Sequence, residues 1–224
     1  MKKTFLSIAI VALAMGMNSC SSDNEPVNLQ SKYITVSTEI NTTRVATDAA
    51  TGTQSFESGD QISVYAWTGD ATQAPQVSDR VVNNAINTFD GATWTAVPQM
   101  LWKNTTDAHY FIGVYPKNAT SVTDLTAAYY TFDVADQETS DLLVAVNAKG
   151  LKSENNPVPL QFNHVMAKLK VSLQFRNQWG STAPTVESVT IKGAASTATV
   201  NYLTQKVEVE DTRDIKLPVA QANK

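Results

Sequence analysis

Cysteine is nearly absent from this sequence, because Cys20 is the only one among 224 residues. No disulfide can therefore link two parts of the chain, and no thiolate site exists after residue 20. His109 and His164 lack the HxxxH and HExxH spacings of metal sites, so we predict structural roles for both. There is no nucleophile elbow and no glycine-rich phosphate loop. Composition alone leaves a Ser-His-Asp triad open, but these absences predict a protein that is not an enzyme and uses no cofactor.

The sequence also has no excess of positive charge, since it contains 17 lysines and arginines and 21 aspartates and glutamates and has a formal net charge of −4. A nucleic-acid-binding chain normally carries a basic footprint, so nucleic acid is not expected among the partners. Leucine-rich segments with helical periodicity are scarce, whereas threonine, valine, serine, alanine and asparagine are abundant. This composition is typical of an extracytoplasmic all-β protein.

The one long hydrophobic run lies at the N-terminus, where Phe5–Met17 follows two lysines. It is shorter than the roughly 20 residues of a membrane-spanning helix, and its length fits a signal peptide. Cys20 follows in the string MNSC, which resembles a lipobox with a polar residue, Asn18, near its middle. We therefore predict that residues 1–19 are a lipoprotein signal peptide and that lipidated Cys20 anchors the chain to the outer membrane. The alternative is an ordinary signal peptide with a cysteine at its cut site.

Residues 20–31, which include the string SSDNEPVNLQ, are polar and acidic and contain one proline. This composition predicts a flexible tether. An acidic stretch directly after the lipidated cysteine also resembles the surface-export signal of Bacteroides-type lipoproteins. The expected location is therefore the cell surface, with the lipid held in the outer membrane.

Short apolar runs recur after residue 31 and predict strands. The predicted strands are Lys32–Ile40, Gln61–Trp67, His109–Pro116, Tyr129–Val134, Asp141–Val146 and His164–Phe175. In the second run, Val64 and Ala66 share one face and Tyr65 lies on the other. The third run is apolar on both faces, as in a central buried strand. The last run has the clearest period of two, whereas Ser78–Ile86 is interpreted as a short helix or an irregular segment.

Many strands without helices between them predict an all-β fold, with a β-sandwich of Greek-key type over residues 32–179. A linker-like stretch, Gly180–Pro184, separates it from a second set of short strands. The roughly 40 residues that follow are too few for a sandwich core of their own. We predict that residues 185–224 begin a second β domain that is truncated. Packing onto the first domain and pairing with strands of a partner are the alternatives.

Five strings occur in a characteristic order: SFESGDQISVYAW, NTFDGATWTAVPQMLWK, HYFIGVYP, SDLLVAV and LQFNHVMAKLKVSL. Together they resemble the fimbrillin family, the Mfa-like fimbrial proteins or type V pilins of Bacteroides-type bacteria. The resemblance covers Lys32–Phe175 well and continues more weakly through VTIKGAASTATVNYL. It implies sandwich domains of transthyretin-like topology and a structural or adhesive subunit of surface fimbriae.

The resemblance also implies a route of assembly. In polymerising members a protease cuts after an arginine and removes the first strand, and a donor strand from a neighbouring subunit then fills the groove by β-strand addition. Arg44, in the string NTTRVATDAATGTQSF, matches that cut position. Other fimbrial subunits are therefore the expected partners. The alternative for Arg44 is an ordinary solvated arginine in a loop. The resemblance also implies a longer chain with a full C-terminal domain, so no donor strand from such a domain is identified in this sequence.

A second function is left open: a monomeric surface lipoprotein whose sandwich binds glycans or other host or bacterial surface ligands. The candidates for sugar stacking are the tryptophans, for which core packing is the default interpretation: Trp67, Trp94, Trp102 and Trp179. An acidic cluster could bind calcium, but it lacks EF-hand spacing and is interpreted as a solvated loop. Its members are Asp133, Asp136, Glu138 and Asp141.

Overall fold

The computed structural model describes residues 32–41, 55–132, 140–167, 173, 175 and 184–217. In chain order, the regular elements of these residues are β1 (Val36–Ile40), β2 (Gln61–Thr68), the 3-10 helix η2 (Val77–Asp79), β3 (Arg80–Phe89), β4 (Trp94–Val97), β5 (His109–Tyr115), β6 (Ala128–Thr131), β7 (Leu143–Leu151), the 3-10 helix η3 (Ser153–Asn155), β8 (Val158–His164), β9 (Val189–Asn201) and β10 (Lys206–Leu217). No helix in this part of the chain is long and apolar enough to cross a membrane.

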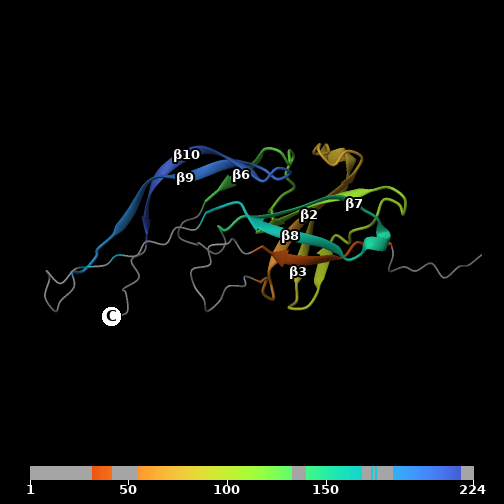
Figure 1. Cartoon of the computed structure of the whole chain (residues 1–224), viewed down its shortest axis with the longest axis horizontal. Coiled ribbons are helices and arrows are strands. Elements are labelled where there is room, and N and C mark those ends of the chain that lie inside the picture. Colours follow the sequence, from red (N-terminus) through yellow and green to blue (C-terminus); the bar gives the residue numbers. More distant parts are fainter. Residues whose placement is uncertain are drawn as a thin grey trace, which may run out of the picture.

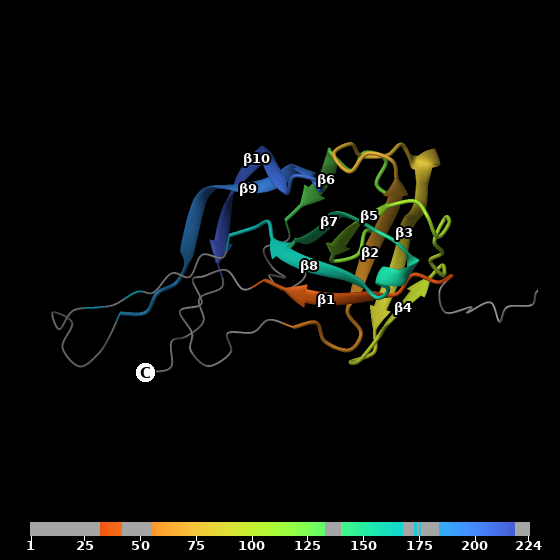
Figure 2. The same ribbon diagram turned by 45° about the vertical axis from the view of Figure 1, so that its right-hand side comes forward.

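The strands form two sheets. The larger has seven strands in the order β1-β8-β7-β5-β2-β3-β4, and the smaller has three in the order β10-β9-β6. All neighbours are antiparallel except β1 and β8, which run parallel. The larger sheet makes the body of the molecule, and β9 and β10 extend away from it (Figures 1 and 2). The predicted all-β sandwich is confirmed.

The alternation predicted for β2 sorts its side chains between two hydrophobic clusters. Ile62 and Val64 lie in the cluster that also contains the inward side chains of β1 and β8. Tyr65 and Trp67 lie in the second cluster, together with side chains of β6 and β9. Strand β5 is the fourth of the seven and contributes to both clusters, as predicted for a central strand that is apolar on both faces. The core therefore has two layers, one on each side of the larger sheet.

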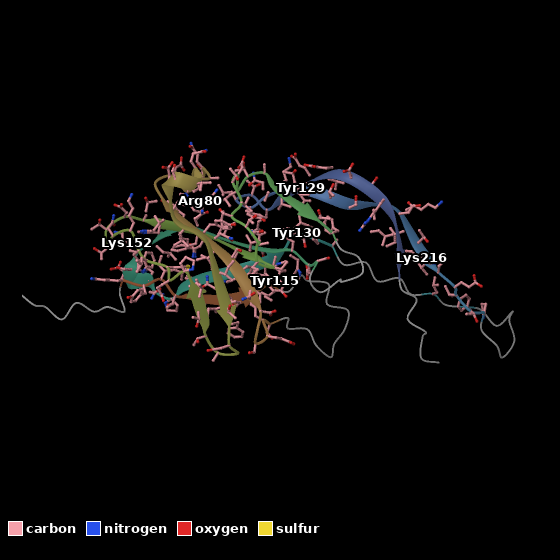
Figure 3. All side chains as sticks on the ribbon, turned by 180° about the vertical axis from the view of Figure 1, so that it is seen from behind. Arg80, Tyr115, Tyr129, Tyr130, Lys152 and Lys216 are labelled. Atoms are coloured by element: carbon pink, nitrogen blue, oxygen red, sulfur yellow. The ribbon has the colours of Figure 1, made fainter. Side chains whose placement is uncertain are left out.

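A buried polar network joins the larger sheet to the β5–β6 connection and the β9–β10 turn. Arg80 donates hydrogen bonds to the carbonyl oxygen of Val122 at 2.6 Å, and its guanidinium carbon lies 5.4 Å from the ring centroid of Tyr65. Asn118 donates to the Tyr65 hydroxyl at 3.1 Å and accepts from the Tyr202 hydroxyl at 3.3 Å. Burial lowers the pKa of Arg80 and raises that of Tyr65. The network therefore fixes the connection to the body, on the side where Figure 3 labels Arg80.

The prediction for Ser78–Ile86 is wrong, because this segment belongs largely to β3 and only Val77–Asp79 is helical. The physical reason is an irregularity in β3. The register with β2 shifts between Val64 and Ala66, and Asn84 has a positive φ of 56°. A bulge of this kind interrupts the period of two, so the sequence shows no clean alternation there.

The strand predicted over His164–Phe175 is also wrong for the residues that the structure describes. His164 is the last residue of β8, and Val165–Ala167 have no strand structure. Leu173 and Phe175 are 53% and 42% exposed, although both were expected to face the core. The pairing of β8 with β7 ends at the Leu143–His164 pair. A period of two shows that a segment could form a strand, but it does not provide the neighbour that a strand needs.

The C-terminal strands contribute to the core of the same body. β9 pairs with β6 through residues 197–200, and the side chains of Val200 and Tyr202 are almost fully buried beside Tyr65. The far ends of β9 and β10 lie away from the body, as the position of Lys216 shows (Figure 3). The described residues of this region therefore pack onto the body, and the predicted truncation of a second domain stays a prediction. The predicted division between residues 179 and 185 falls mostly outside the described residues and stays a prediction.

Candidate functional site

β1 is an edge strand of the larger sheet and pairs with its neighbour β8 in parallel. The predicted segment Lys32–Ile40, which includes β1, alternates along its length: Ile34 and Val36 are 1% and 6% exposed, while Tyr33, Thr35 and the other outward side chains are exposed. It lies in register with β8, from the pair Val36–Val158 to the pair Ile40–Phe162. Figure 2 shows β1 beside β8 at the edge of the larger sheet. We define residues 33–41, which include β1, as the β1 segment, and the surface of the body that this segment covers as the β1 groove.

Backbone hydrogen bonds hold both ends of the segment. The amide of Val158 donates to the carbonyl of Thr35 at 2.8 Å, and the amide of Asn41 donates to the carbonyl of Phe162 at 2.8 Å. At the start of the segment, the amide of Ile34 donates to the carbonyl of Met100 at 3.0 Å. Main-chain bonds of this kind do not depend on the side chains of the bound strand, so they would accept another sequence.

Asparagine side chains extend the main-chain pairing. Asn156 accepts a bond from the Thr35 amide at 2.9 Å and donates to the carbonyl of Tyr33 at 3.2 Å. Asn41 donates from its side chain to the side-chain oxygen of Asn163 at 2.8 Å. The asparagine from the body thus recognises the backbone of β1, whereas Asn41 belongs to the segment itself.

The inward side chains of the β1 segment complete the hydrophobic cluster beneath them. Ile34 and Val36 pack in the cluster that includes Leu160 and Phe162 of β8, and Ile40 packs against its margin. Full burial of a side chain of this size contributes about 1.5–3 kcal/mol. Removal of β1 without a replacement would expose this apolar surface to water, which is unfavourable.

The third inward position of the β1 segment is polar. Thr38 is only half-buried, and its hydroxyl oxygen accepts a hydrogen bond of 3.1 Å from Nε1 of Trp94. Trp94 itself is 8% exposed and stacks on Phe89, with ring centroids 4.9 Å apart. Since Trp94 begins β4, this bond joins the two edges of the seven-stranded sheet.

Phe56 closes the end of the groove near Ile40. Its ring lies edge-on to Trp94, Tyr115 and Phe162, with centroid separations of 5.2, 5.4 and 5.2 Å. Phe56 follows the segment of residues 42–54 that joins β1 to the body. An aromatic residue of the body therefore lies at the end of the strand where the connection leaves it.

The predicted lipidation and maturation residues lie outside the described residues. This applies to Cys20 and to Arg44, and also to the predicted signal peptide and tether. The structure does describe the residues that flank the segment containing Arg44, since Asn41 precedes it and Ser55 follows it. Both predictions stand as predictions.

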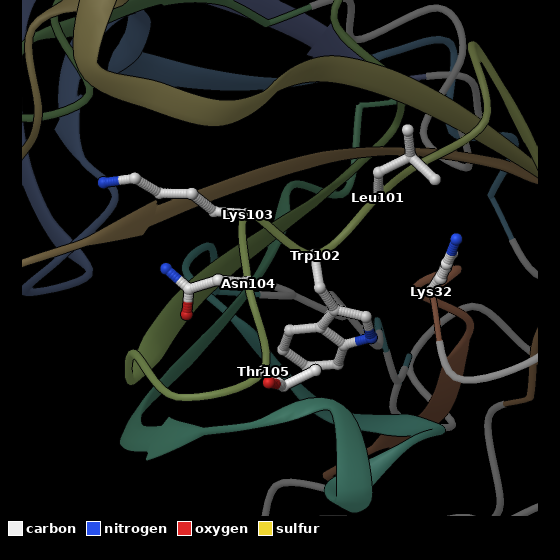
Figure 4. A pocket seen from close by; sticks show the side chains of 6 residues that line it. All are labelled: Lys32, Leu101, Trp102, Lys103, Asn104 and Thr105. Carbon is white, nitrogen blue, oxygen red and sulfur yellow. The ribbon is translucent and has the colours of Figure 1, made fainter. Parts of the chain in front are cut away.

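A small cavity lies at the beginning of the β1 segment. It measures about 300 Å³ and is lined by Lys32, Leu101, Trp102, Lys103, Asn104 and Thr105 (Figure 4). The indole nitrogen of Trp102 is buried and has no hydrogen-bond partner among the described residues. Leu101 is 50% exposed and forms an isolated bridge with Tyr33. The cavity thus combines one apolar side chain, two lysines and an unpaired donor.

The histidines have structural partners, as predicted. His109 is fully buried, and its Nε2 accepts a bond of 3.1 Å from the Lys103 amide while Nδ1 lies 3.0 Å from the carbonyl of Asp107. Burial lowers its pKa. His164 lies 2.9 Å from a carboxylate oxygen of Asp141. It ends a strand, although the sequence suggested that it opens one.

Among the described residues, the acidic cluster forms no metal site and the tryptophans form no exposed platform for sugar stacking. Asp141 is the only member of the predicted calcium cluster that the structure describes, and no group of metal-binding side chains occurs among the described residues. Trp67, Trp94 and Trp102 are at most 8% exposed, which confirms the core interpretation for these three. Trp179 lies outside the described residues.

Sequence reasoning missed the two side chains that hold β1 most specifically, Trp94 and Asn156. Trp94 was interpreted only as a core or stacking residue, and Asn156 only as part of a turn. The alternation of Lys32–Ile40 offered one signal, because Thr38 occupies an inward position that is otherwise apolar. A hydroxyl at such a position indicates a buried partner, but the sequence does not identify it.

Comparison with known proteins adds a family. A family model described as fimbrillin-like matches residues 43–224. Among solved structures, the chain is similar to a candidate cell adhesion protein from Bacteroides ovatus, with 18% identity and a TM-score of 0.59 over 86% of this chain and 74% of that one. A candidate cell adhesion protein from Bacteroides uniformis is 22% identical, with a TM-score of 0.57 over 74% of this chain and 66% of that one. At these identities the likeness shows the fold alone, and no curated protein matches the chain.

Proposed function

Because this chain belongs to the fimbrillin-like family, whose role at the cell surface is fimbrial or adhesive, we propose that it is a fimbrial subunit assembled by exchange of β1. In this proposal β1 occupies the groove of the precursor. A strand from a neighbouring subunit replaces it in the fibre and makes the same main-chain hydrogen bonds with β8. The chain then acts as a structural or adhesive component and catalyses no reaction.

The observation that carries this proposal is the character of β1. It is a parallel edge strand in a sheet that is otherwise antiparallel, and Val36, together with Ile34 just before the strand, is buried in the main core. It is also joined to the body in sequence only through the segment that contains Arg44. One cut in that segment would free the strand while every other strand of the sheet stays covalently connected.

Export and maturation complete the proposal. Lipidation at Cys20 carries the precursor to the outer membrane, and residues 20–31 act as a tether. Cleavage after Arg44 releases Cys20, its lipid and β1 together, because all three precede the cut. An uncut chain would instead remain attached to the membrane and keep its own strand, as an anchor subunit would.

Mass spectrometry of the chain purified from assembled surface fibres tests this proposal. The expected N-terminus is Val45, and an Arg44→Ala variant should accumulate as a lipidated precursor outside the fibres. A Cys20→Ser variant, as a control, should lose the lipid but keep the fold. Fibre-incorporated chains that still begin at lipidated Cys20 would contradict the proposed maturation.

A monomeric ligand-binding lipoprotein is the second candidate, and the cavity beside Trp102 favours it. The lysines Lys32 and Lys103 in its lining suit an acidic sugar, although the indole N–H of Trp102 is buried and the described tryptophans form no exposed stacking platform. Saturable binding of an acidic glycan, lost on Lys103→Ala, together with no strand exchange, would favour this candidate over the first.

A further inference from the structure

The four inward positions of residues 34–40, which are Ile34 and the three inward positions of β1, do not have the same chemistry. Ile34 and Val36 are buried among apolar side chains, and Ile40 packs at the margin of the same cluster. Between them Thr38 faces the indole nitrogen of Trp94. The outward side chains, from Tyr33 to Glu39, are exposed and contribute little to recognition.

The polar contact at Thr38 depends on Trp94, which belongs to the body. Trp94 is held by stacking on Phe89 and by edge contact with Phe56, and its side chain is 8% exposed. Its N–H therefore stays in place when β1 leaves. A strand with an apolar residue at this position would leave a buried donor unpaired and should bind about tenfold or more weakly.

We propose that the β1 groove selects a partner strand that carries a hydroxyl side chain at the third inward position. The inference rests on the proposed function and specifies its partner. Read from the N-terminus to the C-terminus in the direction of β1, the preferred segment is apolar-x-apolar-x-(Ser or Thr)-x-apolar. Trp94 is the specificity-determining residue, because among the described residues it makes the only side-chain hydrogen bond from the body to an inward side chain of β1.

Competition between peptides tests this selection. The probe is a fluorescent peptide with the sequence of Lys32–Asn41, exchanged in mild urea into the full chain after a specific protease site at Arg44 has been cut. Unlabelled peptides of the same sequence, and with Thr38→Ser or Thr38→Val, then compete. The serine peptide should compete within a few-fold of the parent, and the valine peptide about tenfold or more weakly.

The Trp94→Phe variant provides the matched control, because it keeps an aromatic ring and removes the N–H. In this variant the threonine and valine peptides should bind equally. If the variant does not fold, the serine and valine peptides on the unmodified chain decide alone.

Equal competition by the valine and threonine peptides on the unmodified chain would overturn the selection while leaving strand exchange intact. If the cut chain never exchanges the labelled peptide, strand exchange itself fails, and the inference fails with it. The two failures are therefore distinguishable.

Discussion

Trp94 donates a hydrogen bond of 3.1 Å from its indole nitrogen to the hydroxyl oxygen of Thr38. The two residues belong to β4 and β1, which are the opposite edges of the seven-stranded sheet. The Tyr33–Leu101 bridge joins the same two regions through the backbone. The sheet therefore curls so that the β1 edge meets the connection that follows β4 at the other edge.

Removing this acceptor should destabilise the intact chain. We expect Thr38→Val to lower the free energy of unfolding by about 1–3 kcal/mol, because a buried N–H loses its partner while the volume stays similar. Thr38→Ser keeps the oxygen and should cost less. Urea unfolding checks both, and the effect of the valine should vanish in a Trp94→Phe background. A full valine effect in that background would show that the bond is not its cause.

Gly113 of β5 lies close to the side chains of Phe162 and Leu160 beneath the groove. A Cβ at this position of β5 would lie 2.8 Å from Cζ of Phe162 and 3.1 Å from Cδ1 of Leu160. Gly113→Ala should therefore lower the free energy of unfolding by about 1–3 kcal/mol through overpacking. Adding Phe162→Leu should recover part of the loss in the same unfolding measurement. If the double variant loses as much free energy of unfolding as the two single variants added together, the steric explanation is contradicted.

The sequence predicted strands whose alternation is regular and failed where the alternation is broken or lacks a partner. β1, β2 and β5 were predicted because inward and outward residues alternate cleanly or the strand is apolar throughout. β3 was missed because the irregularity at Asn84 interrupts its period. The Trp94–Thr38 contact spans 56 positions, so it depends on the curl of the sheet, which no local pattern encodes.

His109 should make the fold sensitive to acid. Burial lowers the pKa of this histidine from its ordinary value, and its Nε2 accepts the bond from the Lys103 amide only when neutral. The unfolded chain therefore takes up a proton near about pH 6.5, where the folded chain does not. The stabilisation is complete above that pH and is lost as the pH falls towards the lower folded pKa.

Urea unfolding at about pH 7.5 and about pH 5 measures this effect. His109→Gln offers an acceptor that does not titrate, so its loss of stability on acidification should be smaller than that of the parent. Because His164 and the carboxylates are present in both chains, their contributions cancel in the comparison. An equal loss in both chains would exclude His109 as the cause.

Tyr202 should be essential for the whole body rather than for the hairpin alone. Its side chain is 1% exposed in the cluster that contains Tyr65 and Trp67. Tyr202→Ala should lower the free energy of unfolding by about 3–5 kcal/mol, and Tyr202→Phe by much less because only the bond to Asn118 is lost. Tryptophan fluorescence during unfolding measures both. An unchanged transition for Tyr202→Ala would show that the hairpin is not part of the cooperative unit.

The most direct measurement of the central claim is fibre formation by a chain whose β1 cannot leave. Glu39 and Gln161 are register partners on β1 and β8, and both point outward. Replacing both with cysteine allows a disulfide that holds the strand in its groove after any cut at Arg44. A control pair at Thr88 and Thr95 joins β3 to β4, which are not expected to separate. The account predicts fibres from the control in either redox state, and from the Glu39→Cys, Gln161→Cys chain only after reduction. Fibres that contain this chain with its disulfide intact would contradict the exchange of β1.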